Sequence, residues 1–126
     1  MMKPVNPPDV HSLGRFSPGI EVSGTSRQLL VSGQVGLRPD GTLAEGIEAQ
    51  LECCWANVLA VLRAAGMGVG NIAKVTTYVT DPAYLRVHPA VRARVLGEHR
   101  PAATGVCVTA LASPDWLCEI EVVAVD

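Results

Sequence analysis

The chain ends in the stretch WLCEIEVVAV, residues 116–125, whose alternating pattern decides the fold class. One face of a strand with this sequence carries Trp116, Cys118, Ile120, Val122 and Ala124. The opposite face carries Leu117, Glu119, Glu121, Val123 and Val125. The first face suits packing against helices, whereas the second mixes acids with large aliphatic side chains that open solvent would serve poorly. We therefore expect a sheet with helices on one face and another subunit against the other.

The middle of the chain predicts a helix followed by a strand. Apolar residues recur at helical spacing from Ile47 to Leu62, and Ala65-Gly66 places a glycine where a left-handed cap is expected. This pattern predicts a helix of about five turns. Residues 72–80 are rich in β-branched side chains and predict a strand.

The segment after that strand predicts a second helical region. Asp81-Pro82 supplies an N-cap residue and then a proline at the first helical position. The His88-Pro89 pair is expected to break this region, because proline disfavours the α conformation in the residue before it. We expect a short helix, a break at His88 and a second helix that ends near Gly97.

Two hairpins are predicted at the two ends of the domain. Residues 20–22 and 28–37 have strand composition and are separated by turn residues, and residues 104–111 and 116–125 flank a loop of hairpin composition. The order ββαβαββ then indicates an α/β (α+β) sandwich with helices on one face of a mixed sheet. We expect one domain over residues 1–126, with the proline-rich residues 1–18 as an extended N-terminal arm rather than a packed element.

The composition of the chain favours some classes of binding partner and disfavours others. It is 48% hydrophobic and only 17% charged, which favours a homo-oligomer with buried subunit faces. A net charge of −2 gives no attraction for nucleic acid or anionic membranes, and no apolar run approaches the roughly 20 residues of a membrane span. The first residues lack the apolar core of a secretory signal, so we expect a cytoplasmic protein.

The cysteines and histidines do not have the spacing of a metal site. Cys53 and Cys54 are adjacent on the predicted helix, and Cys107 and Cys118 lie in separate strand-like runs. The three histidines are scattered along the chain. We expect four reduced thiols, no metal and no cofactor.

Two residues are candidates for a site on sequence grounds. Gly33 interrupts an apolar strand, which marks either close approach of a ligand to the backbone or a bulge without function. Glu119 lies on an apolar strand, where it is either a carboxylate that needs partners or a solvated acid at a sheet edge.

Several motifs in order resemble the RidA/YjgF family of reactive intermediate deaminases, also labelled the endoribonuclease L-PSP family. The resemblance covers the chain from about residue 20 to its end. The motifs are LLVSGQ (residues 29–34), VLAVLRAAG (58–66), AKVTTYVTD (73–81), RPA (100–102) and LCEIEVVA (117–124).

The resemblance implies a homotrimer with a central barrel and small-molecule clefts between neighbouring subunits. Deaminating members hydrolyse enamines and imines, such as 2-iminobutanoate, to a keto acid and ammonia without a metal or organic cofactor. By resemblance, Gly33 would approach the ligand, Glu119 would orient water or substrate, and Phe16 is a candidate for the aromatic residue of the cleft. His88 stands where relatives have an asparagine. It would be either a proton carrier near neutral pH or a helix-break residue that caps backbone groups.

One position departs from the family pattern. Deaminating members have an arginine after the Pro-Ala pair to grip the substrate carboxylate, whereas this chain continues with Ala103, Thr104 and Gly105. We therefore expect an enamine or imine deaminase with a substrate other than a simple 2-imino acid. A non-catalytic protein that binds a metabolite in the same cleft is the alternative. Endoribonuclease activity is disfavoured by an aromatic content of 4% and the negative net charge.

Overall fold

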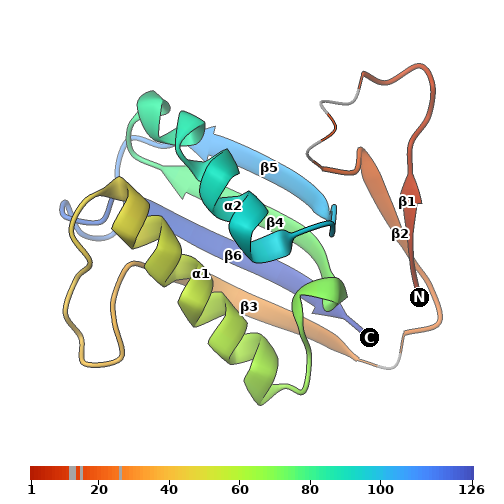
Figure 1. The fold of residues 1–126 in the computed structure, drawn as a ribbon, viewed down its shortest axis with the longest axis horizontal. Coiled ribbons are helices and arrows are strands. Elements are labelled where there is room, and N and C mark those ends of the chain that lie inside the picture. The colour runs from red at the N-terminus through yellow and green to blue at the C-terminus, as the bar shows by residue number, and fades with distance from the viewer. Residues whose placement is uncertain (12–13, 15, 26) are drawn as a thin grey trace.

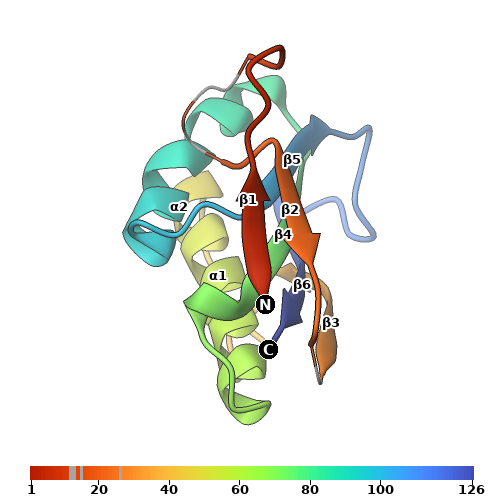
Figure 2. The same ribbon diagram turned by 90° about the vertical axis from the view of Figure 1, so that its right-hand side faces the viewer.

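The fold has two layers, a four-stranded sheet and two α-helices that cover one of its faces (Figure 1, Figure 2). The computed structural model describes residues 1–11, 14, 16–25 and 27–126. The sheet has the strand order β3-β6-β4-β5, formed by β3 (Gln28–Val35), β6 (Cys118–Val125), β4 (Ile72–Val79) and β5 (Ala102–Cys107). The predicted fold class, a mixed sheet with helices on one face, is confirmed.

The helices begin and end close to the predicted positions. Helix α1 spans Ile47–Ala64, and Gly46 and Gly66 on its two sides have φ angles of 85° and 71°, which favour glycine. The second helical region consists of the 3₁₀ helix η2 (Pro82–Arg86) and α2 (His88–Leu96). Asp81 caps η2, because its carboxylate accepts a hydrogen bond from the Ala83 backbone N–H at 2.9 Å.

The core lies between the helices and the covered face of the sheet. Its largest fully buried side chains come from α1, from β4 and from the covered face of β6, and include Trp55, Leu51, Leu62, Ile72 and Ile120. The 3₁₀ helix η1 (Val69–Asn71) connects α1 to β4. This packing holds the two inner strands, β6 and β4, rigidly, which fixes the side chains that project from their other face.

The last strand alternates as predicted. Cys118, Ile120, Val122 and Ala124 are buried against the helices, whereas Glu119, Glu121 and Val123 are half-buried on the face that no helix covers. We call this second face the open face of the sheet. Val125 differs from the prediction, because it is buried at the end of the strand with 4% of its surface exposed.

The predicted pairing at the N-terminus is wrong. Strand β2 (Gly19–Val22) pairs with β1 (Met2–Val5) in an antiparallel ribbon, and not with β3. Residues 2–5 of the predicted arm are therefore a paired strand, and the ribbon stands beside the start of β5 (Figure 1). The turn residues between β2 and β3 predicted that these two strands form a hairpin. Turn residues favour a change of chain direction, but they do not determine which strand β2 pairs with.

The predicted hairpin at the C-terminus is also wrong. Strand β5 pairs in parallel with β4, and β6 lies between β4 and β3, antiparallel to both. The chain therefore crosses from β5 over β4 before it enters β6, so the apolar β6 occupies an inner position. The parallel pair β4–β5 is connected through η2 and α2, as parallel strands require a long crossover.

No helix within the described residues is long and apolar enough to cross a membrane.

Candidate functional site

A bulge in β3 creates the most constrained contact on the open face. The register with β6 shifts between Val31 and Gln34, so Ser32 and Gly33 lie in the irregular part of the strand. After the shift, Val35 of β3 is the partner of Glu119 in β6. From the sequence, Gly33 marked either close approach of a ligand to the backbone or a bulge without function. The structure shows a bulge at this position with a carboxylate beside it.

The side chain of Glu119 lies directly over Gly33. A Cβ atom added to Gly33 would be 2.7 Å from Cδ and 2.9 Å from Cγ of Glu119, closer than real Cβ atoms come to other atoms. Glycine at position 33 is therefore what lets this carboxylate lie flat against the strand. Sequence-predicted residues Gly33 and Glu119 are brought together in a single chain.

Tyr78 of β4 extends this cluster. It is the cross-strand partner of Glu119, and its hydroxyl donates a hydrogen bond to Oε1 of Glu121 at 2.7 Å. This hydrogen bond to a carboxylate, together with partial desolvation, raises the pKa of Tyr78 above its usual value. Tyr78 therefore stays protonated at neutral pH and acts as a donor. We refer to Gly33, Tyr78, Glu119 and Glu121 as the open-face cluster.

Sequence reasoning did not single out Tyr78. The alternation of residues 72–80 places Tyr78 on one face of a strand with Lys74 and Thr76, and that signal was present. Its position opposite Glu119 depends on the pairing of β4 with β6, which the predicted hairpins did not contain.

Residues 103–105 lie on the outer strand, away from the cluster. In β5, Ala103 is the partner of the buried Val75, and Gly105 is the partner of Thr77. Both positions therefore face the helices, and a Cβ added to Gly105 would meet Leu85 of η2 at 3.2 Å. Thr104 faces the open side, where its hydroxyl accepts a hydrogen bond from Nζ of Lys74 at 2.6 Å.

Phe16 lies at the other end of β5. It lines a cavity between the β1–β2 ribbon and the segment that contains Glu98 and His99. The next residue, Ser17, anchors this segment, because its backbone N–H donates to the carbonyl of Pro101 at 3.2 Å. Within one chain, Ala103 on β5 is thus separated from Glu119 by β4, and from Gly33 by β4 and β6.

His88 is a core residue in this structure. It is 5% exposed, its Nε2 accepts a hydrogen bond from Nε1 of Trp55 at 3.2 Å, and the two rings are stacked with centroids 6.1 Å apart. Burial, with a smaller contribution from the Arg92 charge, lowers the pKa of His88 to about 4. A neutral, internally bonded imidazole does not support the role of proton carrier, and its partner is a side chain rather than the backbone groups it was expected to cap.

The four cysteines are free thiols. Cys54 of α1 and Cys118 of β6 are buried with their sulfur atoms 3.7 Å apart, and this mutual hydrogen bond, with burial, raises the pKa of Cys54. The described residues contain no group of three or more histidine, cysteine or acidic side chains that could hold a metal ion.

The chain is similar in sequence to several known proteins of one family. A family model described as Endoribonuclease L-PSP matches residues 8–126. The chain is 43% identical over 70 residues to a RutC family protein of Aquifex aeolicus, a match that spans 55% of this chain and 54% of that protein. It is 32% identical over 118 residues to the 2-iminobutanoate/2-iminopropanoate deaminase of Salmonella typhimurium, with 90% and 89% of the two chains covered.

A solved structure matches nearly the whole chain. It is a protein of unknown function of the conserved Rid protein family from Yersinia pestis, with a TM-score of 0.88, 32% sequence identity and 98% of each chain covered. The similarity therefore includes both the sheet with its helices and the N-terminal part of the chain.

Proposed function

The chain belongs to the RidA/YjgF family, the Endoribonuclease L-PSP family of the matching model, and from this premise we propose that it hydrolyses small imines or enamines at the open-face cluster. The observation that carries the proposal is the Glu119 carboxylate held over the backbone of Gly33. The Salmonella relative is named as a deaminase of 2-iminobutanoate and 2-iminopropanoate, which supports the reaction class for this chain.

The chemistry requires only water and a positioned base. A water molecule adds to the carbon of the C=N bond while Glu119 takes one of its protons and passes it to the nitrogen, which gives a tetrahedral aminoalcohol. Glu119 then takes the proton of the new hydroxyl group and delivers it to the nitrogen as the C–N bond breaks, so that ammonia and a carbonyl compound leave and the carboxylate is regenerated. No electron transfer is involved, so the reaction balances without a cofactor.

We propose that a second copy of the chain completes the site in a homotrimer. Phe16 and residues 103–105 lie around β5, away from the Gly33–Glu119 contact of the same chain, so they would meet the Glu119 of a neighbour. The open face supports such packing, because it combines Val123 with a Leu30 side chain that is 70% exposed. Sedimentation at micromolar concentration tests this, and a stable monomer would contradict it.

The substrate we propose is an imine or enamine without the carboxylate of a simple 2-imino acid. At position 103 a methyl group stands where deaminating relatives are expected to have a guanidinium. The loss of a charge-assisted contact weakens binding by about 1.5–3 kcal/mol. The acids Glu119 and Glu121 on the same face would further disfavour an anionic substrate, including RNA.

The test generates imines in situ from amines and amino acids with an oxidase and follows the release of carbonyl product. We expect turnover of neutral imines, little of 2-iminobutanoate, and loss of activity in Glu119→Gln. Glu21→Gln is the matched control, because Glu21 is an exposed acid on β2.

Two results would contradict the proposal. Efficient 2-iminobutanoate turnover by the wild type would refute the substrate class, and full activity of Glu119→Gln would refute the assigned base. Absence of turnover with every imine, together with ligand-induced thermal shifts that require Glu119, would favour a non-catalytic binding protein instead.

A further inference from the structure

A hollow of about 260 Å³ lies on the open face of the sheet, next to the open-face cluster. Two of its lining side chains are charged, Lys74 of β4 and Glu121 of β6. Leu30 and Val123 supply aliphatic surface beside them. Glu121 belongs to both the hollow and the open-face cluster. The hollow is therefore an extension of the proposed site, where the part of the substrate that does not react would lie.

The strand register places the charges of this face in a fixed order. Glu119, Glu121 and Val123 follow one another along the same face of β6. Lys74 of β4 is the cross-strand partner of Val123, so it is a diagonal neighbour of Glu121. Diagonal neighbours of this kind have Cα atoms about 7–8 Å apart. A ligand that extends from Glu119 along this face therefore meets a second carboxylate and then an ammonium group.

Lys74 is oriented by a neutral partner and keeps its charge. Its Nζ donates a hydrogen bond to Oγ1 of Thr104 on β5 at 2.6 Å. The ion pairs formed within residues 1–11, 14, 16–25 and 27–126 join Arg27 and Arg94 to acids elsewhere, and none of them includes Lys74. An ammonium group has three N–H donors, so two of them are available to an anionic group in the hollow.

Glu121, at the other end of the hollow, is also oriented by a neutral partner. Its Oε1 accepts the hydrogen bond from the Tyr78 hydroxyl, and no described residue donates to its Oε2. Glu119 has neither a hydrogen bond nor an ion pair with the described residues. Two half-buried carboxylates without a cationic partner favour the binding of a cation at this end. The hollow and the cluster together are thus negative at one end and positive at the other.

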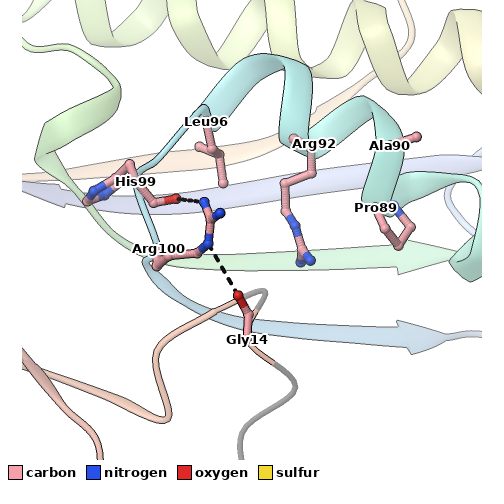
Figure 3. A pocket seen from close by; sticks show the side chains of 8 residues that line it. Gly14, Pro89, Ala90, Arg92, Leu96, His99 and Arg100 are labelled. Atoms are coloured by element: carbon pink, nitrogen blue, oxygen red, sulfur yellow. Dashed lines mark hydrogen bonds between the residues drawn. The ribbon is translucent and has the colours of Figure 1, made fainter.

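Arg100 is another cation near β5, but its surroundings are different. Figure 3 shows its side chain in a cavity bordered by α2, with hydrogen bonds to the backbone carbonyls of His99 and Gly14. This cavity lies on the helix side of the sheet, and Arg100 also borders the cavity around Phe16. Within the described part of one chain, Lys74 is therefore the cation beside the open-face cluster.

On the basis of the proposed function, we propose that the substrate is a protonated imine that carries a carboxylate at the far end of an aliphatic chain. The iminium group lies at Glu119 and Glu121, the carboxylate lies at Lys74, and the chain packs against the aliphatic side chains of the hollow. Water adds to C=NH₂⁺ and the C–N bond breaks, so the products are a carbonyl compound and ammonium, with atoms and charge balanced. A simple 2-imino acid does not fit this arrangement, because its carboxylate is attached to the reacting carbon and would lie beside Glu119 rather than Lys74.

The first experiment titrates the full-length protein with 5-aminopentanoate, pentylamine and pentanoate at constant ionic strength, by calorimetry or NMR. The protonated amine of the first two compounds replaces the iminium group and does not react with water. We expect 5-aminopentanoate to bind most tightly, because it carries both charges. Lys74→Gln should weaken its binding roughly three- to tenfold and leave the binding of pentylamine unchanged. Lys3→Gln removes the same charge from an exposed position on β1 and should leave the binding of both compounds unchanged.

The second experiment measures turnover. An amine oxidase generates the imines of pentylamine and 5-aminopentanoate in situ, and the release of the aldehyde is followed. We expect the wild type to have a higher kcat/KM for the imine that carries the carboxylate. Lys74→Gln should remove this preference without loss of activity on the pentylamine imine. Lys74→Arg should keep the preference, and it serves if the glutamine variant does not fold.

Either of two results would overturn this substrate class: binding of 5-aminopentanoate no tighter than that of pentylamine, or a Lys74→Gln variant that keeps the full preference for the carboxylate. A preference that is lost in Arg100→Gln but kept in Lys74→Gln would place the carboxylate at Arg100 and would also overturn it. A wild type that binds 5-aminopentanoate through Lys74 but hydrolyses neither imine would refute the proposed hydrolysis and support the assigned ligand. The two proposals therefore fail separately.

Discussion

The two faces of strand β6 differ in what their side chains do. Towards the helices, Cys118, Ile120 and Val122 are buried in a continuous apolar core. Towards the open face, Glu119 and Glu121 are half-buried, in contact with Gly33 and Tyr78. One strand therefore supplies stability on one side and the candidate chemistry on the other. The rigid, covered face therefore holds the open-face cluster in position.

The largest effect should come from truncating the covered face. Ile120→Ala removes a fully buried side chain and should destabilise the protein by about 2–5 kcal/mol. Val123 lies on the open face of the same strand and is only half-buried. Val123→Ala should therefore lower the free energy of unfolding far less and should weaken subunit association instead. Urea unfolding and sedimentation would measure the two. Equal losses in the free energy of unfolding for the two variants would show that both faces contribute equally to stability, which contradicts this division of roles.

His88 should make the covered face sensitive to acid. Its pKa is lowered to about 4 in the folded protein and is about 6.5 in the unfolded chain, so the unfolded state binds the extra proton between these values. The stability is full above pH 6.5 and falls by about 3 kcal/mol as the pH drops through 4.

The measurement for His88 compares urea unfolding at pH 7 and pH 4.5. His88→Asn should lose most of this pH dependence, whatever its absolute stability, whereas the exposed His11→Asn should keep it. If the stability of the His88→Asn variant depends on pH as strongly as that of the wild type, other titratable groups cause the effect.

Two glycines of one region give a finer test of the two faces. A Cβ on Gly36 would lie 2.8 Å from Cγ and 3.0 Å from the backbone Cα of Gln50 in α1, so Gly36→Ala should push the helix away and destabilise the protein by about 1–3 kcal/mol. A Cβ on Gly33 meets only the flexible side chain of Glu119. The Gly33→Ala variant should therefore unfold at nearly the same urea concentration as the wild type but should lose imine hydrolysis. A Gly33→Ala variant that is unstable yet active, or a Gly36→Ala variant that is stable yet inactive, would contradict the assignment of the faces.

The smallest effect on stability is expected for Tyr78. Tyr78→Phe removes the hydrogen bond to Glu121 at the half-buried surface, which should cost about 0.5–1.5 kcal/mol. If Tyr78 keeps the acids of the cluster in position, turnover should fall more than stability does. Thr76→Val, a nearby change on the same face of β4, is the control, and equal losses of turnover in the two variants would remove Tyr78 from the cluster's function.

Much of the fold could be predicted because its signals are local. The periodicity of α1, the Asp81 cap of η2 and the alternation in β6 depend on residues a few positions apart, and the structure agrees with each except at Val125, the last residue of β6. The same reasoning paired β2 with β3 and β5 with β6, and both pairings were wrong. Strand pairing depends on contacts across the whole chain, which turn composition does not encode.

The candidate site divides in the same way. Gly33 and Glu119 were chosen from the sequence and the family resemblance, and the structure puts them in contact. His88 was chosen as well, but its side chain packs on Trp55 of α1, a contact between residues 33 positions apart.

The sequence by itself determined the element types, the two faces of β6 and the absence of an arginine at position 103, because these follow from residue identity and short-range spacing. That Glu119 lies over Gly33 and that Tyr78 is the cross-strand partner of Glu119 followed only from the folded chain. The physical reason is that such contacts join segments distant in the sequence. Their geometry is set by the packing of the helices on the sheet and by the order of its strands.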